Sequence, residues 1–401
     1  MGHSLTRARD AASPPPGPLD GIVVVDFSRV LAGPYCTMIL ADLGATVIKI
    51  ESARGDDTRQ WMPPSVDAIS SYYLSINRNK QSICLNLKDD KDLQTAYDIV
   101  DRADVLVENF KPGGLKKFGL DVSQTSERWP NLIHASITGF GTRGGAGMPG
   151  YDLLVQALSG FMHVTGEPSG GPQRAGFAIF DVFTGLHAAV GILAALHERG
   201  LTQKHAGQSV EVNLLSSALS AMVNQTAAYT AAGYEPMRMG NEHPSLFPYG
   251  PFAAKDGEIV ICCGNDTQFA TLMAALGTPE LASDERYTSM ELRNAHREAL
   301  RASIEESLAA KTVEEWFAEL SDVGICCAPI LTVGGGIDYA TELGLEPVWS
   351  SEEPGAYPTV ANPITFGRTP AAYRLAPPAL NADNAAICDW IATTPRKDHT
   401  Q

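Results

Sequence analysis

Short runs of consecutive apolar residues recur through the first half of the chain, separated by turns and by segments of helical spacing. Runs of this kind are typical of strands that a parallel sheet buries on both faces. The strand-like segments are 21–26, 45–51, 82–87, 104–110, 132–138 and 208–213. The pattern from residue 19 to about 222 therefore predicts an α/β domain with a largely parallel sheet.

The most apolar segment follows Asp181. Residues 184–196 are apolar nearly all round, which favours a buried helix over a surface helix. Asp181 is the one carboxylate between residues 175 and 196, and we expect it at or just before the N-terminus of that helix. Two interpretations remain open. Asp181 is either an N-cap that fixes a core helix or a carboxylate nucleophile in a dry pocket.

The pattern changes after Ala232. A hairpin with its turn at 255–257 is predicted first, and helical spacing follows at 266–276, 289–308 and 312–321. A stretch rich in Gly and Pro then predicts an extended return segment, and residues 381–391 predict a last helix. The expected parts are a disordered leader at 1–18, the first part of a large α/β domain at 19–222, a linker and small α+β domain at 223–332, and a return segment at 333–401 that completes the large domain.

Charge and composition narrow the possible partners. The 401 residues carry a formal net charge of -16, which disfavours nonspecific binding to nucleic acid or to an anionic membrane. No apolar run is recognised as long enough to span a membrane, and the N-terminal leader lacks the apolar core of a signal peptide. The seven cysteines form no C-x-x-C pair, so we expect reduced thiols in a cytoplasmic protein.

Several common site motifs are missing from the sequence. It contains no H-E-x-x-H, P-loop or G-x-S-x-G motif, and we expect neither a metal nor a permanently bound cofactor. The first strand–turn–helix–strand unit ends in Glu51, as a dinucleotide-binding unit does, but its turn lacks G-x-G-x-x-G. A nicotinamide-dependent oxidoreductase therefore remains an alternative with little support.

A basic loop follows the strand that ends near Asn109. Lys111, Lys116 and Lys117 lie there, at what we predict to be the carboxyl end of a parallel strand, where ligands gather in such sheets. The loop is either a solvated surface or a grip for phosphate groups.

A series of short motifs, taken in order, resembles the class III CoA-transferases, the family of formyl-CoA transferase, carnitine CoA-transferase and α-methylacyl-CoA racemase. The motifs are Leu19-Asp-Gly21, Asp26, Ala32-Gly33-Pro34, residues 43–51, Gly55-Asp-Asp-Thr-Arg59, Asn77-Arg-Asn-Lys80, residues 107–110, Gly150-Tyr-Asp152, Ser159-Gly160, Thr165-Gly166 and Asp181-x-x-Thr-Gly185. The resemblance implies a Rossmann-like large domain built from both chain ends, an inserted small domain, and an interlocked homodimer.

The resemblance also implies residue roles. Asp181 becomes the nucleophile that forms an aspartyl acyl anhydride and then an aspartyl-CoA thioester, with acyl-CoA and a free carboxylic acid as substrates. Two departures from the family matter, because Ser52 stands where an arginine is common and no small-domain glycine-rich loop precedes Cys262. The second departure argues against formate or oxalate as substrates. The implied CoA contacts are Leu31, Ala32, Arg54, Leu85, Lys88, Asn109, Phe110, Lys117, Gly150, Tyr151 and Asp152.

Within the family, residues 55–64, 71–80 and 158–163 most resemble the branch that moves CoA from succinyl-CoA to dicarboxylates such as glutarate, itaconate, mesaconate or citramalate. The second carboxylate of such an acid needs a cation in a closed pocket. Alternatively, the nearby arginines pair with Glu51, Asp56 or the CoA phosphates. The candidates for the second carboxylate are Arg29, Arg59, Arg78, Arg174 and His163.

Two further functions are alternatives, and the first of them shares the fold. An α-methylacyl-CoA racemase uses a histidine base where this chain has Tyr151, and tyrosine is a poor base near neutral pH. A noncatalytic CoA-binding protein would be indicated by loss of Asp181, which is present.

Overall fold

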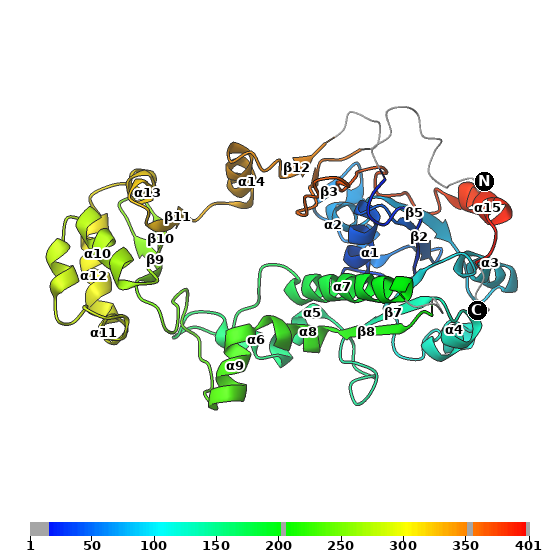
Figure 1. Ribbon diagram of the computed structural model, residues 1–401, viewed down its shortest axis with the longest axis horizontal. Helices are drawn as coiled ribbons and strands as arrows, with labels where there is room; N and C mark the ends of the chain where they lie inside the picture. Colours follow the sequence, from blue (N-terminus) through cyan, green and yellow to red (C-terminus); the bar gives the residue numbers. More distant parts are fainter. Residues whose placement is uncertain (1–15, 202–205, 351–355, 398–401) are drawn as a thin grey trace. The chain divides into compact units, whose positions relative to one another are not determined.

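The computed structural model describes residues 16–201, 206–350 and 356–397, so residues 1–15 of the predicted leader lie outside the described part (Figure 1). The chain forms two compact units. The large unit holds the residues through 161, residues 174–233 and those from 346 onward; the small unit holds 162–173 and 234–345. The borders therefore fall after residues 233 and 345, not after 222 and 332 as expected.

A six-stranded parallel sheet forms the centre of the large unit, which confirms the α/β prediction. Its order is β5-β2-β1-β6-β7-β8, with every neighbouring pair parallel. This is the order of doubly wound folds, in which ligands bind at the carboxyl ends where the strand order reverses, here between β1 and β6. The strands are β1 Val23–Asp26, β2 Thr46–Glu51, β5 Lys80–Cys84, β6 Val105–Glu108, β7 Ile133–Thr138 and β8 Ser209–Asn213.

Helices cover the two faces of this sheet, each face with its own apolar core. One core joins the sheet to α1 Ala32–Asp42, α5 Asp152–Leu158, α7 Ile179–Leu201 and α8 Leu214–Ala221. The other joins it to α3 Asp90–Val100 and α15 Asn384–Thr393, with Trp129 from the end of α4 Val122–Arg128. Both chain ends thus contribute to the large unit, although all strands of its sheet come from residues 23–213.

Helix α7 corrects two predictions. It begins at Ile179, so Asp181 lies in its first turn and is not its N-cap. By length and composition α7 could also cross a membrane, contrary to the sequence-based expectation, but it packs against α1 and β8 in the large unit. The approach to α1 is close: a Cβ at Gly185 would lie 2.6 Å from the carbonyl oxygen of Ala32. A glycine there lets α1 and α7 cross next to Asp181.

The C-terminal return segment is fastened to the C-terminal end of α1. Asp42 is fully buried and accepts hydrogen bonds from Arg78 Nη2 at 2.7 Å, Asn79 Nδ2 at 2.7 Å and Asn362 Nδ2 at 3.1 Å. Arg374 donates to carbonyl oxygens at the end of the same helix and just after it, including that of Ala41 at 2.6 Å. These contacts hold residues 356–397 against the large unit.

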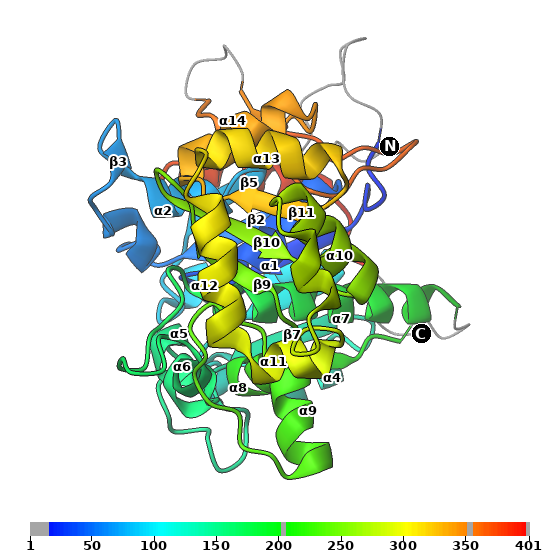
Figure 2. The ribbon, with the colours of Figure 1, turned by 90° about the vertical axis from the view of Figure 1, so that its left-hand side faces the viewer.

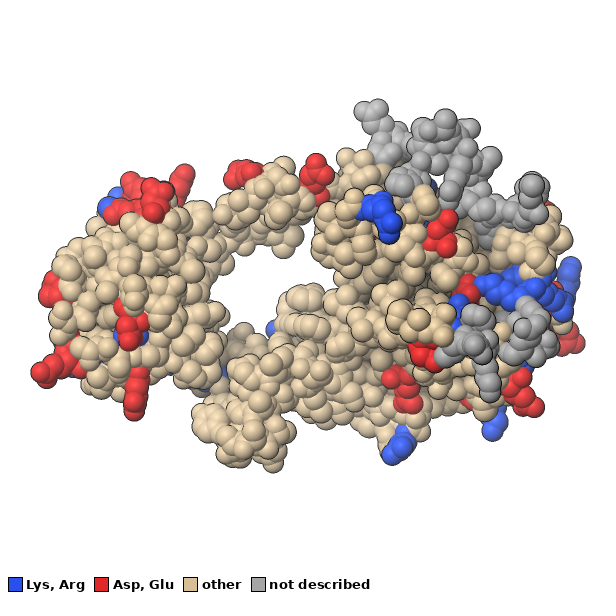
Figure 3. Space-filling model, viewed as in Figure 1, with Lys and Arg blue, Asp and Glu red and all other residues tan. Residues whose placement is uncertain are grey.

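The small unit contains an antiparallel sheet in the order β11-β10-β9, with helices packed around it (Figure 2). The predicted helix 289–308 is two helices broken at His296. Acidic side chains predominate on the face of this unit drawn in Figure 3. Its elements are β9 Tyr249–Ala253, β10 Glu258–Cys262, β11 Cys326–Pro329, α10 Asp266–Ala275, α11 Met290–Ala295, α12 Arg297–Leu308 and α13 Val313–Asp322.

Part of the predicted return segment is helical. Helix α14 Val333–Glu342 forms despite a run of three glycines, and the Thr332 side chain caps it by accepting from the Gly335 N–H at 3.1 Å. Residues 214–232 form two helices, α8 and α9 Val223–Ala232. The remaining elements are β3 Ser65–Val66, β4 Ile69–Ser70, β12 Val348–Trp349, β13 Thr359–Val360, α2 Ser71–Ile76, α6 Phe161–Val164, η1 Asp57–Gln60, η2 Lys116–Phe118 and η3 Pro279–Ser283.

Candidate active site

A network of buried charges lies around strands β1, β2 and β5. Lys80 Nζ lies 3.2 Å from Asp26 Oδ2, and Lys49 Nζ lies 3.0 Å from Asp56 Oδ2, with all four side chains excluded from solvent. Burial alone would raise the pKa of Asp26, but Lys80 and Lys49 outweigh it and hold that pKa below its usual value. Burial lowers the pKa of Lys80 to about 8. Every carboxylate of this network has a cation.

The network extends to two arginines, Arg59 and Arg78, that the sequence analysis names as candidates for the second carboxylate of the substrate. Arg59 donates to Glu51 through Nη2 at 2.6 Å and stacks on the Tyr73 ring with its guanidinium carbon 3.9 Å from the ring centroid. Arg78 is bound to Asp42. Both guanidinium groups already serve intramolecular carboxylates, which matches the alternative interpretation for Arg59 and gives Arg78 a structural role.

The turn between β1 and α1 is held in a strained shape by the same network. Val30 has a φ of 71°, an unusual value for a β-branched residue. Its N–H donates to both carboxylate oxygens of Asp56 at 3.3 Å, and Lys49 Nζ donates to the Ser28 carbonyl at 2.9 Å. The side-chain amide of Asn109 accepts from the Arg29 N–H at 2.9 Å and donates to the Arg29 carbonyl at 2.7 Å.

The side-chain amide of Asn109 therefore stabilises the turn before α1 through two hydrogen bonds, whereas the family resemblance implies that Asn109 contacts CoA. The braced turn leads into Leu31 and Ala32, both buried at the start of α1. Arg29 itself is exposed and pairs with exposed Asp57 at 3.3 Å.

Asp181 is partly buried, and its carboxylate has no ion pair or hydrogen bond among the residues that the structure describes. Burial and then the nearby charge of Asp152 raise the pKa of Asp181 to about 7. Asp152 is buried at the start of α5, where its Oδ1 accepts from the N–H groups of Phe180 at 2.7 Å and Asp181 at 3.2 Å. Its Oδ2 accepts from the amide of Gln156. Asp152 thus caps α7 from a neighbouring helix, although the family resemblance implies that it contacts CoA.

Tyr72 lies close enough for the charges of these two carboxylates to act on its hydroxyl, and sequence reasoning missed it. Burial, then Asp181 and Asp152, raise the pKa of the Tyr72 hydroxyl far above its usual value, so this hydroxyl remains a donor. Its neighbour Tyr73 turns instead to Arg59. Adjacent side chains on a helix diverge by about 100°, so the Tyr-Tyr pair on α2 could have indicated two separate environments. The four-residue spacing of Asp152 and Gln156 could likewise have indicated their contact.

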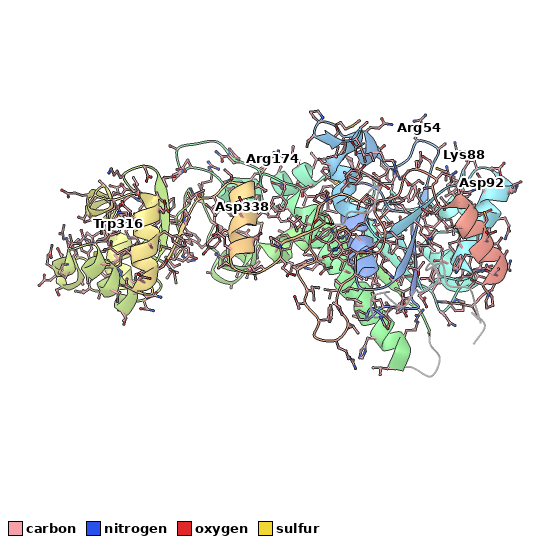
Figure 4. All side chains as sticks on the ribbon, turned by 90° about the horizontal axis from the view of Figure 1, so that it is seen from above. Arg54, Lys88, Asp92, Arg174, Trp316 and Asp338 are labelled. Carbon is pink, nitrogen blue, oxygen red and sulfur yellow. The ribbon has the colours of Figure 1, made fainter. Side chains whose placement is uncertain are left out.

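Several cationic side chains from the implied CoA set lie on the surface. Arg54, Lys88 and Lys117 are exposed, and Figure 4 shows Arg54 and Lys88 on the large unit. Arg174, also labelled there, is exposed and has no ion pair among the described residues. Of the other implied residues, Leu85 is buried, Phe110 is half-buried, and Gly150 and Tyr151 are exposed. His163 belongs to the small unit, and its carbonyl accepts from Arg238.

The geometry at Asp181 suits nucleophilic chemistry. A carboxylate near the start of a helix, with no counter-ion and a pKa near neutrality, is both accessible to a reacting carbonyl and more basic than an ordinary aspartate. Within the described ranges 16–201, 206–350 and 356–397, no group of three or more His, Cys, Asp or Glu residues could hold a metal.

Comparisons with known proteins show the family of the chain. Residues 19–384 match the family model described as CoA-transferase family III. A succinate–glutarate CoA-transferase of Agrobacterium fabrum is 37% identical over 396 residues, which cover 94% of this chain and 97% of that protein. An acetyl-CoA:oxalate CoA-transferase of Acetobacter aceti is 41% identical over 322 residues, covering 80% and 82% respectively. The crystal structure of a CAIB/BAIF family protein from Brucella suis matches with a TM-score of 0.85 and 38% identity, covering 94% of this chain and 100% of that one.

Proposed function

Because the chain belongs to CoA-transferase family III, we propose that Asp181 is the nucleophile in a CoA transfer between two carboxylic acids. The observation that carries this proposal is the unpaired Asp181 carboxylate in the first turn of α7, with its pKa raised to about 7. The buried carboxylates around β1 and β2 have cations within 3.2 Å and are poor candidates for attack on a thioester.

The proposed reaction has two halves. The Asp181 carboxylate attacks the thioester carbonyl of the donor, the C–S bond breaks, and CoA leaves as a thiolate. The thiolate then attacks the aspartyl carbonyl of the mixed anhydride, which releases the donor acid and leaves CoA as a thioester on Asp181. The acceptor carboxylate repeats these steps in reverse, so the thioester bond is conserved and water takes no part.

Tyr72 is suited to assist these steps. Its hydroxyl stays protonated near the two carboxylates and can donate a hydrogen bond to oxygen atoms that gain negative charge. For the substrate, Arg54, Lys88 and Lys117 offer exposed cations to the CoA phosphates. No cofactor needs to remain bound between turnovers in this scheme.

We propose succinyl-CoA as donor and a dicarboxylate as acceptor. The glutarate-specific name of the Agrobacterium relative supports this assignment, and Arg174, exposed and without an ion pair among the described residues, can take the distal carboxylate. The Acetobacter relative is named for oxalate, which is also a dicarboxylate but a much shorter one. Acceptor length is therefore the point that an assay must decide.

We propose that the enzyme acts as a homodimer. Helices α5, α7, α8 and α9 of the large unit expose large apolar side chains, a feature of protein interfaces. Val190 on α7 is 65% exposed, although α7 is otherwise the central helix of one core. A second copy of this chain is the partner implied by the family resemblance. The side chains concerned include Leu154, Leu158, Leu186, Val190, Leu219, Val223 and Tyr229.

The two-half reaction is tested by exchange without an acceptor. Isotopically labelled succinate should enter succinyl-CoA when only enzyme, succinate and succinyl-CoA are present, because the covalent intermediate forms reversibly. Asp181→Asn should lose this exchange by at least about 10³-fold while still binding CoA in calorimetry. Substantial exchange by the variant would rule out the proposed nucleophile.

The acceptor is tested by competition. A mixture of formate, oxalate, carnitine and C4–C6 dicarboxylates, supplied with succinyl-CoA, is read by chromatography of the CoA esters. The C4–C6 dicarboxylates should be consumed first. Preference for oxalate, carnitine or a monocarboxylate would overturn the acceptor assignment and leave the role of Asp181 untouched.

A further inference from the structure

The N-terminal end of α7 has no side-chain cap from its own chain neighbours; a carboxylate from another helix takes that place. The first N–H groups of a helix lack partners inside the helix, and a carboxylate is a favourable partner for them. Asp152 of α5 supplies it, with one oxygen shared between the N–H groups of Phe180 and Asp181. The backbone of Asp181 is therefore bound directly to Asp152.

Gln156 extends this contact to the other end of the same segment. It is fully buried one turn after Asp152, donates to Asp152 Oδ2, and accepts from the Ala175 N–H at 2.8 Å. Asp152 and Gln156 together hold residues 175–181 at both ends. The residue before this segment is Arg174, the exposed arginine assigned above to the substrate.

We propose that Asp152 is the positioning residue of the nucleophile: it fixes Asp181 through that residue's own backbone and sets its negative charge against the Asp181 carboxylate. This role differs from the CoA contact that the family resemblance implies. The side chain of Asp152 is buried, and its oxygens accept hydrogen bonds from groups of the protein. The inference rests on the proposed role of Asp181.

The physical consequence is a more basic nucleophile. The charge of Asp152 opposes ionisation of Asp181 and adds to the effect of burial, raising the pKa of Asp181 to about 7. The other titratable group that couples to Asp181 is Tyr72 on α2, which itself lies near Asp56 and stays protonated. Tyr35 on α1 couples instead to Arg78 and Asp42. On α7 itself, His187 is bound to Ser217 on α8.

Two variants separate the charge from the hydrogen bonds. Asp152→Asn keeps an acceptor for the two N–H groups and removes the charge, but its new amide nitrogen faces the amide nitrogen of Gln156. Adding Gln156→Glu supplies an acceptor for that nitrogen and for the Ala175 N–H, and moves the charge only to the other side of the contact between residues 152 and 156. Asp121→Asn, at the N-cap of α4, is the matched control for loss of a capping carboxylate.

The quantity to measure is the titration midpoint of Asp181. Carbon-13 NMR of labelled aspartate measures it, and Asp181→Asn assigns the signal. In Asp152→Asn the midpoint should fall by about one pH unit or more. The acid limb of kcat/KM, which rises with pH as Asp181 ionises, should move down by the same amount. The double variant should recover the fold and the plateau rate, with a midpoint between those of the wild type and of Asp152→Asn. Asp121→Asn should leave both curves unchanged.

An unchanged midpoint in Asp152→Asn would overturn the proposal, and so would an equal fall of the midpoint in Asp121→Asn. Because NMR reads the titration without turnover, it can succeed even if Asp181 proves not to be the nucleophile. In that event Asp181→Asn would remain active while the Asp152-dependent shift persisted, so the failure of the proposed function is distinguishable from the failure of this inference.

Discussion

Two groups of buried carboxylates in the large unit differ in one respect. Around β1, β2 and β5, Asp26, Asp56 and Glu51 each lie within 3.2 Å of a cation, and their pKa values fall below the usual range. At the start of α7, Asp181 faces another carboxylate, Asp152, and its pKa rises to about 7. The same residue type is stabilised as an anion in one region and destabilised in the other.

This difference distinguishes carboxylates that support the fold from the carboxylate that is proposed to react. The paired carboxylates hold the Val30 turn and the ends of the strands, where a fixed charge is useful and reactivity is not. The Asp181 carboxylate has no cation among the described residues to compete with an incoming carbonyl, which suits the attack proposed above. Removing a charge should therefore have opposite effects on stability in the two regions.

The largest effect is expected in the paired region. Asp56→Ala leaves Lys49 charged and buried without its partner and releases the Val30 N–H, so the free energy of unfolding should fall by about 3–5 kcal/mol. Urea unfolding measures this change. Asp57→Ala is the matched control next in sequence: its pair with Arg29 is exposed, and the loss should stay below about 0.5 kcal/mol. Equal losses in the two variants would contradict the account.

The opposite sign is expected at Asp181. Its folded pKa of about 7 exceeds the ordinary 3.8, so between these values the folded chain holds more protons, and stability falls as pH rises through that window. The Asp181→Asn variant cannot ionise at this position, so it avoids this loss of stability. With a discount for partial exposure, the variant should gain about 2 kcal/mol near pH 8 and almost nothing near pH 4.

The measurement at Asp181 is urea unfolding at both pH values and one protein concentration, since an oligomer depends on concentration. The paired region provides the contrast: Asp56, with its lowered pKa, contributes stability above its ordinary pKa that is lost as pH falls. A destabilised Asp181→Asn at high pH would show that the carboxylate has a cation after all.

A smaller effect is expected at the edge of the paired region. Asn109→Ala removes both hydrogen bonds to the Arg29 backbone, so the free energy of unfolding should fall by about 1–3 kcal/mol. The turn before α1 should also loosen, which hydrogen exchange of its amides would detect. If exchange there is unchanged while KM for acyl-CoA rises, Asn109 contacts CoA instead.

The smallest effect is expected at Lys117, an exposed residue that the proposed function assigns to the CoA phosphates. Lys117→Ala should raise KM for the CoA ester several-fold, leave kcat nearly unchanged, and alter stability by less than about 0.5 kcal/mol. Steady-state kinetics with varied acyl-CoA gives both constants. A loss confined to kcat would remove Lys117 from the CoA grip.

The sequence predicted the parallel sheet because its strands are buried on both faces and so are apolar throughout. It failed where tertiary contacts decide the outcome. Helix α7 begins before Asp181 because Asp152, a residue 29 positions away, caps it. Helix α14 is different, because its cap Thr332 directly precedes it and accepts from the Gly335 N–H, so its start could have been predicted from local spacing. Asp152 could not have been identified in that way.

The candidate site residues also differ in how much the sequence alone shows about them. Asp181 could be selected as a candidate because it is a lone carboxylate in an apolar run, which the sequence alone shows. Arg59 and Arg78 lie in motifs that look like ligand sites, yet their partners Glu51 and Asp42 come from other segments. Sequence spacing cannot distinguish an arginine that binds a ligand from one that is paired with a carboxylate of the protein.

The most direct test of the central claim is the mass of the covalent intermediate. The enzyme is mixed with acyl-CoA alone, the intermediate is trapped with hydroxylamine or borohydride, and the digested protein is analysed by mass spectrometry. The account predicts modification of Asp181 and its loss in Asp181→Asn. It predicts no modification of Asp56 or Glu51, because each is paired with a cation that makes its carboxylate a weaker nucleophile. Modification at any other residue, or turnover with no trapped adduct at Asp181, would contradict it.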